Sequence, residues 1–347
     1  MPRIPSHKDI AEKADVSQMT VSLALRNHSS LPAATRLRIQ RIAQEIGYTR
    51  DPRVAEIMGY LRHRRGSKHY PVIAFINVWA KHTAVHDDPY FRLFCDGASA
   101  RAHDLGFRLE EFWLREPGMH AARLSGILKT RGIHGVILPM IPPGEPSIAL
   151  DWSAFSIVAI SLNAHALGLH HVCNNRVHTM EHTLEQLQRR GYRRIGLVLD
   201  RDIDERSRHQ WAGYFHWAQS CLPGAQRVPL LIQPAYERAG FLAWLRAKRP
   251  DVVVSPHAPI LDWMRAARCR VPAQCGFCGF GLHDGHGPNV AGLDERPALV
   301  GSAAVDQVTS QMQRNERGIP QDRREILVES VWRSGGTLRE PPPDTFA

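Results

Sequence analysis

Two cysteines in the last third of the chain stand at a spacing that could bind a metal ion or carry redox chemistry. Cys275 and Cys278 form a Cys-x-x-Cys pair, and Cys269, His283 and His286 stand close to it in the sequence. Cysteine and histidine are the usual ligands of structural zinc, and Cys-x-x-Cys pairs also occur in redox sites. The run around them, CGFCGF, is apolar, so both cysteines can instead serve as small core residues of a strand.

A second pair, His178 and His182, has the spacing that places two imidazoles on one face of a helix. No Glu follows His178 as in the His-Glu-x-x-His motif, and no third ligand is evident. The chain also lacks a phosphate loop ending in Gly-Lys-Ser or Gly-Lys-Thr and a Gly-x-Ser-x-Gly nucleophile motif. We therefore expect a protein that is not an enzyme and that uses neither a metal nor a cofactor.

Positive charge is the chemistry that the N-terminal end supplies. Residues 1–70 contain 13 Lys and Arg against 6 Asp and Glu, whereas the whole chain of 347 residues has 44 against 34. The net charge is therefore +7 in this segment and +3 in the remainder. A basic end on a nearly neutral body is typical of a protein in which one module neutralises DNA phosphates and another has a different task.

The basic N-terminal segment contains two short helical patterns separated by a tight turn. Ser6 and Asp9 form a capping-box pair before the first helix, and Asp15 stands in the turn, where we expect a positive φ. A second helix is expected from about Ser17, and a third helix is expected to follow Thr35. The second helix should turn inward Val21, Ala24 and Leu25. These three helices predict a small all-α head.

Three successive motifs of this head resemble the lactose and galactose repressor type of bacterial transcription regulator. They are DIAEKADVSQMTVSLAL, ATRLRIQRIAQEIGY and DPRVAEIM, in that order. The resemblance implies a helix-turn-helix domain over residues 1–50, with Gln18, Met19 and Leu23 at base-reading positions. The DNA-binding residues expected in all are Ser6, Ser17, Gln18, Met19, Thr20, Ser22, Leu23, Arg26, Thr35, Tyr48, Arg53 and Met58.

The chain departs from this family at three positions of the head. Asp15 replaces the usual turn Gly, Pro32 the usual Ser before the third helix, and Leu23 an Arg that often reads bases. Leu23 and Met19 can contact thymine methyls, and Gln18 can pair with adenine. We therefore expect A·T pairs opposite these side chains in a palindromic operator.

The segment after the head, residues 51–70, resembles the family's hinge helix and its linker. Asp51 suits the N-cap and Pro52 the first helical position, so a short helix from Pro52 to about Leu61 is expected. Met58 takes the place of the apolar wedge that enters the minor groove of DNA. The alternative is that Met58 is an ordinary buried apolar residue.

From Pro71 onward, strand-like and helix-like runs alternate, which predicts parallel sheets covered by helices on both faces. Strands are expected at 72–79, 107–114, 134–140, 156–162, 194–200, 228–232, 251–255, 275–280 and 325–330, and helices at about 91–105, 120–131 and 177–191.

This body, residues 71–340, resembles the family's effector domain, which has a two-lobed α/β fold of the periplasmic-binding-protein-like (type I) class. Motifs that carry the resemblance include RGIHGVIL, VPAQCGFCGF and GLDERPALVGSAAVDQVTSQMQRNERGIP. The resemblance implies a first lobe of residues 71–162 and 290–320, and a second lobe of 163–289 and 321–340. It also makes CGFCGF a core strand, which favours the core role for both of its cysteines.

A ligand cleft is expected between the two lobes. Positions where sugar-binding relatives carry Asp, Asn or Arg hold Ser161, Gln210, Pro256, His257 and Gly281 here. Carboxylates and Arg suit the hydrogen bonding of sugar hydroxyls, so these replacements disfavour an ordinary monosaccharide. A carbohydrate or a derivative of one stays the candidate class, with its identity open. The residues expected to line the cleft are Asn77, Tyr90, Ser161, Gln210, Trp211, His257, Phe280 and Glu295.

The function that these features predict is an effector-controlled transcriptional repressor that binds DNA as a homodimer. No run of about 18 apolar residues and no apolar signal segment occurs, so we expect a cytoplasmic bacterial protein that contacts no membrane and joins the nucleoid when DNA-bound. The alternative is a cytoplasmic ligand carrier, or an enzyme of the sugar-binding fold, with a vestigial DNA-binding head.

Overall fold

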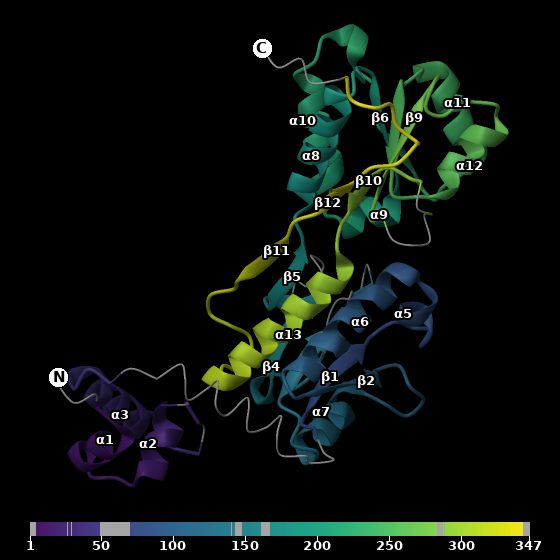
Figure 1. Ribbon diagram of the computed structural model, residues 1–347. Coiled ribbons are helices and arrows are strands. Elements are labelled where there is room, and N and C mark those ends of the chain that lie inside the picture. The colour runs from purple at the N-terminus through teal and green to yellow at the C-terminus, as the bar shows by residue number, and fades with distance from the viewer. Residues whose placement is uncertain are drawn as a thin grey trace.

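A computed structural model of the protein shows a helical head and two α/β lobes (Figure 1). Within the described residues, no helix combines the length and the apolar character needed to span a bilayer. The residues that the structure describes are 5–25, 27–28, 30–48, 70–139, 141–142, 148–160, 167–282, 287 and 289–342. The predictions that lie outside these ranges concern residues 51–69 of the hinge helix and linker, Arg26, Arg53, Met58, Ser161, His283 and His286.

The head consists of α1 (His7–Ala14), α2 (Gln18–Leu25) and α3 (Ala33–Glu45). The capping box is confirmed, because the Ser6 backbone N–H donates to Asp9 Oδ2 at 2.6 Å. The positive φ of Asp15 is also confirmed, at 50°. The third helix begins three residues earlier than expected, because Pro32, with φ −55°, already presets the turn that leads into it.

One apolar core holds the three head helices together. Ile10 and Ala14 of α1, Val21 and Ala24 of α2, and Ile39 of α3 are fully buried. The expected inward face of α2 is thus confirmed at Val21 and Ala24, and Leu25 packs against the same cluster. Because Asp15 ends α1 and α2 begins three residues later, the opposite face of α2 is left on the surface.

The first lobe is built on a six-stranded parallel sheet with the order β11-β5-β4-β3-β1-β2. Apolar clusters cover both faces of this sheet. The strands are β1 (Val72–Asn77), β2 (Arg108–Trp113), β3 (Gly135–Leu138), β4 (Ser156–Ile160), β5 (His170–Asn174) and β11 (Glu325–Val328), and the helices are α5 (Ala84–Asp87), α6 (Pro89–Asp104), α7 (Ala121–Thr130), η1 (Trp152–Ala154) and α13 (Pro297–Arg314).

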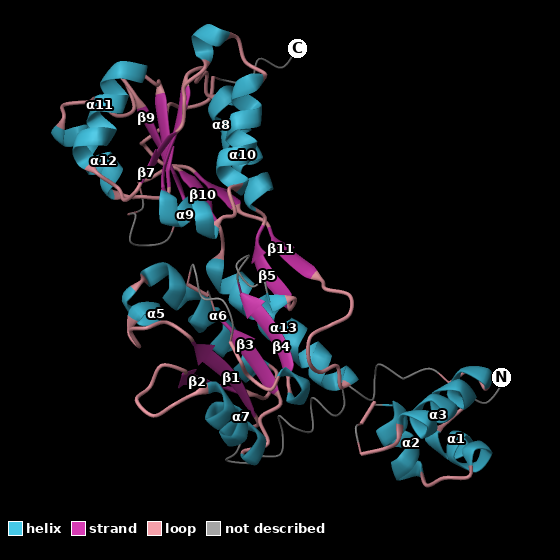
Figure 2. Ribbon diagram, turned by 180° about the vertical axis from the view of Figure 1, so that it is seen from behind, coloured by secondary structure: helices cyan, strands magenta, loops and turns pink. Residues whose placement is uncertain are grey.

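The second lobe has a sheet with the order β12-β10-β9-β8-β6-β7, in which only the β10–β12 pair is antiparallel. Its strands are β6 (Ile195–Asp200), β7 (Leu231–Gln233), β8 (Val252–Ser255), β9 (Gly276–Phe280), β10 (Gly292–Asp294) and β12 (Val331–Arg333), and its helices are α8 (Arg176–Arg189), α9 (Arg201–Arg206), α10 (Gln210–Ser220), η3 (Gly224–Gln226), α11 (Arg238–Lys248) and α12 (Pro259–Ala266). Figure 2 shows α8 and α10 on one face of this sheet and α11 and α12 on the other.

The expected strands and helices of the body are all present, with ends that differ by a few residues. Three further strands, β5, β10 and β12, were not expected. β5 has the sequence HHVCN and lacks the apolar character of a buried strand, yet all five residues are buried. It is stable there because β4 and β11 pair with it and because His170 Nδ1 accepts a hydrogen bond from the Arg324 N–H at 2.9 Å.

Strand pairing also corrects the expected lobe boundaries. β5 and β11 belong to the first sheet, although both were expected in the second lobe (163–289 and 321–340). β10 belongs to the second sheet, although residues 290–320 were expected in the first lobe. The chain therefore crosses between the lobes after β5, after β10 and after β11. The physical reason is that a strand joins a sheet through hydrogen bonds to strands far away in the sequence. A local sequence pattern does not contain this information.

Two glycines allow α6 and α13 to pack closely in the first lobe. A Cβ at Gly97 would lie 1.9 Å from the Ala298 carbonyl oxygen, and one at Gly301 would lie 2.0 Å from the Phe94 carbonyl oxygen. Any larger side chain would force the helices apart. This contact fixes the start of α13, and with it Glu295, beside the start of α6.

Candidate functional site

The outer face of α2 carries the side chains that were expected to read bases. Gln18 is exposed, Met19 is 67% exposed, and Leu23 is half-buried on the same helix. Ser17 caps this helix, because its Oγ accepts a hydrogen bond from the Thr20 N–H at 3.1 Å. Exposed apolar side chains on such a helix can contact thymine methyl groups in the major groove of DNA.

Other residues expected to contact DNA lie on and around this helix. Ser22 is half-buried on α2, and Thr35 is half-buried in the first turns of α3. The Tyr48 hydroxyl lies 2.9 Å from His7 Nε2, which joins the end of the head to α1. Ser6 is engaged in the capping box. Contact of these residues with DNA stays a prediction.

Replacing Leu23 by Arg should change which base pair the head prefers. An Arg can donate two hydrogen bonds to guanine O6 and N7, whereas Leu can donate none. We expect Leu23→Arg to shift one symmetric position of the operator toward G·C, by about 1–3 kcal/mol per contact. Selection from a random DNA pool measures this. The matched control is Leu37→Arg, which adds the same charge at an exposed position of α3. Identical consensus sequences for Leu23→Arg and the unmodified protein would exclude Leu23 from base contact.

A cavity of about 240 Å³ lies where the two lobes meet. The N-terminal end of α6 contributes to it from the first lobe, and α9, α10 and the end of β9 contribute from the second. Two crossing segments, after β5 and after β10, complete its wall. Its lining residues are Asp88, Tyr90, Phe91, Arg176, Ile203, Arg206, Ser207, Trp211, Pro256, Phe280, Gly281 and Glu295.

Four residues expected in the cleft, Tyr90, Trp211, Phe280 and Glu295, line this cavity. Three others that were expected there are not among its lining residues. Asn77 is fully buried in the first lobe, and Gln210 lies at the start of α10, half-buried. The expectation that these two face the cavity is therefore wrong. It is also wrong for His257, whose ring stacks on Tyr236 with 3.9 Å between the ring centroids.

Glu295 is a carboxylate buried at the crossing between β10 and α13, with an exposed fraction of 2%. The Tyr90 hydroxyl donates to its Oε2 at 2.6 Å. Burial raises the pKa of Glu295, while the Arg176 guanidinium and the Tyr90 hydrogen bond oppose that shift. Burial and the Glu295 carboxylate in turn raise the pKa of Tyr90 well above its usual value, so its hydroxyl keeps its proton and donates. The second oxygen, Glu295 Oε1, has no protein partner in the described structure.

Two arginines of the cavity wall, Arg176 and Arg206, were missed from the sequence. Arg176 is the first residue of α8, directly after the N-cap Asn175, and its guanidinium carbon lies 5.5 Å from the Trp211 ring centroid. Arg206 ends α9, and its Nη2 lies 2.9 Å from Asp202 Oδ2. The sequence did contain a positional signal, because Arg176 stands two residues after the end of β5, and the carboxyl ends of parallel strands commonly face a cleft.

Several buried donors of this wall lack a partner among the described residues. They are Nε and Nη1 of Arg176, Nε of Arg206 and the indole Nε1 of Trp211. Buried polar atoms are normally hydrogen-bonded, so a group of such donors around one cavity indicates a ligand with acceptor atoms. Glu295 Oε1 is an acceptor in the same wall and indicates a ligand donor such as a hydroxyl. The arrangement can thus bind a small molecule that is both anionic and hydroxylated.

The Cys-x-x-Cys pair lies in the core of the second lobe. Cys275 immediately precedes β9 and Cys278 lies within it, with exposed fractions of 3% and 0%. Both pack in apolar clusters on the two faces of the sheet. Burial raises the pKa of the Cys278 thiol to about 12, which disfavours the thiolate that metal binding requires. The role as core residues is confirmed.

Comparisons with known proteins match both parts of the chain. A family model described as "Bacterial regulatory proteins, lacI family" matches residues 7–51, the helical head and the residues that follow it. A model of the periplasmic binding protein-like domain matches residues 184–334. Among curated proteins, no match was found.

Solved structures share the fold over nearly the whole chain. A "transcriptional regulator CelR-cellobiose complex" is 18% identical with a TM-score of 0.58, covering 95% of this chain and all of that one. The lac repressor dimer bound to operator and the anti-inducer ONPF is 15% identical with a TM-score of 0.58, covering 97% and 100%. A lacI-family transcriptional regulator from Silicibacter pomeroyi is 19% identical with a TM-score of 0.55, covering 97% and 100%. At these identities the likeness establishes the fold.

Proposed function

Because the chain belongs to the lacI family of bacterial regulatory proteins, we propose that it is a repressor that binds a palindromic operator as a homodimer and is released or retained by an anionic, hydroxylated effector. It is a DNA-binding transcription regulator with an effector-binding domain. The outer face of α2 supports the DNA-binding part, since its exposed polar and apolar side chains suit a major groove. No turnover of the effector is expected.

The effector class rests on one observation, the unpartnered polar atoms of the cavity wall. Arg176, Arg206 and Trp211 together present several buried donors, and Glu295 Oε1 presents one acceptor. An Arg pair with an indole N–H matches a carboxylate or phosphate, since charge-assisted hydrogen bonds to such groups are strong and directional. Glu295 then accepts from a hydroxyl. A cavity of about 240 Å³ lies below the usual ~300–1,000 Å³ of drug-sized pockets, so the effector is a small metabolite.

The placement of these groups supports control through the angle between the lobes. Tyr90 belongs to the first lobe, Arg206 and Trp211 belong to the second, and Arg176 and Glu295 lie at the crossings. A ligand that contacts all of them binds best at one lobe angle. An effector shifts a conformational equilibrium only by its difference in affinity for the two states, and contacts spread over both lobes supply such a difference.

A thermal-shift screen with matched pairs of ligands tests the effector class. The pairs are glucuronate against glucose, gluconate against sorbitol, and glucose 6-phosphate against glucose. We expect at least one anion of this type to raise the unfolding temperature while its neutral partner does not, since a ligand at 100 times its Kd stabilises by about 2.7 kcal/mol. Stabilisation by neutral sugars and by no anion would contradict the proposal.

A gel shift distinguishes the regulator from the alternative carrier or enzyme with a vestigial head. The probe is DNA from around the protein's own gene, searched for a palindrome. We expect a specific complex whose amount changes when the stabilising anion is added. A protein that binds the anion and no palindromic DNA would favour the alternative.

A further inference from the structure

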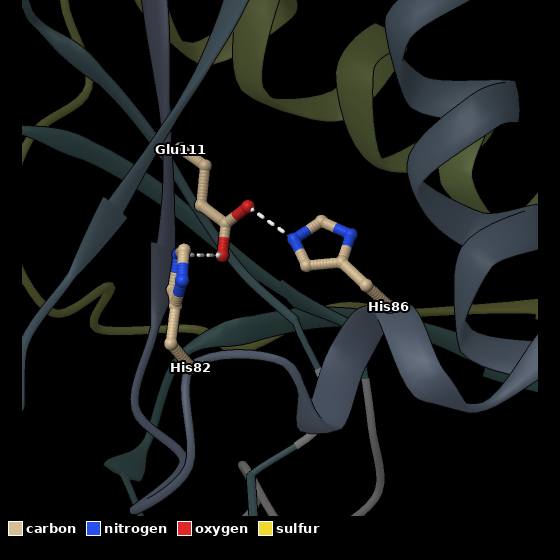
Figure 3. A group of neighbouring side chains, drawn as sticks. All are labelled: His82, His86 and Glu111. Carbon is tan, nitrogen blue, oxygen red and sulfur yellow. Dashed lines mark hydrogen bonds and ion pairs between the residues drawn. The ribbon is translucent and has the colours of Figure 1, made fainter.

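A second group of polar side chains lies outside the cavity, on the first lobe. His82 precedes α5 and His86 lies within it, and both face Glu111 of the edge strand β2. Figure 3 shows the two imidazoles approaching the two oxygens of this carboxylate from different sides. His86 Nε2 lies 2.7 Å from Glu111 Oε2, and His82 Nε2 lies 3.5 Å from Glu111 Oε1. One ligand atom from each of the three side chains lies within 4.8 Å of the other two.

These distances suit a common metal ion. Zinc binds nitrogen and oxygen ligands at about 2.0–2.2 Å, which places ligand atoms of a tetrahedral site about 3.3 Å apart. The spacings between Glu111 and the two histidines lie on either side of that value. Small rotations of exposed side chains are enough to bring all three into the coordination sphere. The existing contacts of Glu111 with the two histidines would cost little to replace by metal ligation. Exposed ion pairs are weak, and all three side chains are at least partly accessible.

Hydrogen bonds from neighbouring residues fix the Glu111 carboxylate and the backbone at His82 and His86. Asn77 at the end of β1 is fully buried, and its Nδ2 donates both to Glu111 Oε1 and to the His82 carbonyl oxygen, each at 2.9 Å. The Trp113 ring centroid lies 5.1 Å from that of His82. Arg92 Nη2 donates to the His86 carbonyl oxygen at 2.9 Å. Such outer contacts orient metal ligands and raise affinity.

The charged side chains next to this group already have partners, so His82, His86 and Glu111 form the candidate ligand set. The Asp87 carboxylate accepts hydrogen bonds from Lys81 Nζ at 2.6 Å and from Thr83 Oγ1 at 2.8 Å. Asp87 is therefore engaged elsewhere, and it balances the charge of Lys81. The remaining donors are two imidazoles and one carboxylate, a set typical of zinc sites that keep a position open for water.

We propose that His82, His86 and Glu111 bind a divalent transition-metal ion of the zinc type. Imidazole ligands favour zinc, nickel, cobalt and copper over magnesium and calcium, which prefer oxygen. A bound ion would tie α5 to β2. Because α5 leads directly into Asp88 and Tyr90 of the cavity wall, the ion would also fix that part of the wall. This site does not depend on the proposed effector.

Metal titration of the full-length protein tests the site. After treatment with a chelator and its removal, Zn²⁺ and Co²⁺ are titrated by calorimetry and by the visible absorption of Co²⁺. We expect one ion per chain for the unmodified protein, and at least a tenfold lower affinity for His86→Gln and for Glu111→Gln. The matched control is His216→Gln, an exposed histidine of α10, which should bind as the unmodified protein does.

Circular dichroism of each variant establishes that it is folded, and these exposed or partly exposed positions should tolerate the change. Three outcomes would overturn the proposal. One is that the unmodified protein binds no ion. Another is that His86→Gln and Glu111→Gln retain full affinity, which would place the ion elsewhere. The third is that Mg²⁺ or Ca²⁺ competes equally with Zn²⁺.

Discussion

Raising the salt concentration from about 50 to 200 mM should weaken operator binding by the homodimer about a thousandfold. Residues 1–70 carry a net charge of +7, whereas the remaining chain carries +3. Each phosphate neutralised by Lys or Arg releases condensed counterions, so two such heads give a slope of log K against log salt on the order of −5 or steeper. Filter binding or fluorescence anisotropy at four salt concentrations measures the slope.

Two arginine variants identify which part of the chain produces this slope. Arg26→Gln removes one positive charge from the expected DNA-binding residues of each head, so the slope should become shallower by about 2 for a dimer if each Arg26 neutralises a phosphate. Arg193→Gln removes an exposed charge from the second lobe and should leave the slope unchanged. A slope near zero for the unmodified protein would remove the DNA-binding interpretation, and an equal effect of both variants would place the contacts outside the head.

Replacing Arg206 by Gln should lower the affinity for the anionic effector by roughly 10- to 150-fold. Hydrogen bonds to charged groups contribute about 1.5–3 kcal/mol, and every 1.4 kcal/mol is a factor of ten in Kd. Arg176→Gln should have an effect of the same size, because both guanidinium groups have unpartnered buried donors at the cavity. Calorimetric titration with the anion that stabilises the protein measures the loss.

Matched variants separate a direct contact from a general effect of charge. Arg201→Gln changes the exposed first residue of α9, the helix that Arg206 ends, and Arg189→Gln changes the exposed end of α8. Both should bind the anion as the unmodified protein does. Glu295→Gln should weaken binding of the hydroxylated anion more than binding of a deoxy analogue. Unchanged affinity of Arg176→Gln and Arg206→Gln would show that the anion does not bind in this cavity.

The head shows how much a local pattern can determine. Ser6, Asp9 and Asp15 specified the start and the end of α1, and the helical period of α2 separated its buried Val21 from its exposed Met19. These predictions held because capping and helical periodicity involve residues only three or four positions apart. The apolar runs of the body likewise predicted its parallel sheets, since a strand buried on both faces must be apolar.

The cavity shows what no local pattern contains. Tyr90, Trp211, Phe280 and Glu295 were placed by family resemblance, but Arg176 and Arg206 were not, because their importance arises from the crossings of the chain between the lobes. Those crossings depend on β5, β10 and β11, whose sheet membership is decided by hydrogen bonds between distant strands.

The group at His82, His86 and Glu111 has the same origin. The sequence contains two pairs of histidines four residues apart, His82 with His86 and His178 with His182, and this spacing alone does not distinguish a metal site from an ordinary helix face. Parallel pairing of β1 with β2 places Glu111 beside the first pair, and the buried Asn77 of β1 holds it there. Sequence by itself therefore determined the head helices and most strands of the body through short-range periodicity, and family resemblance supplied the two-lobed fold class. The tertiary structure alone decided which charged side chains meet, because that depends on contacts between residues far apart in the chain.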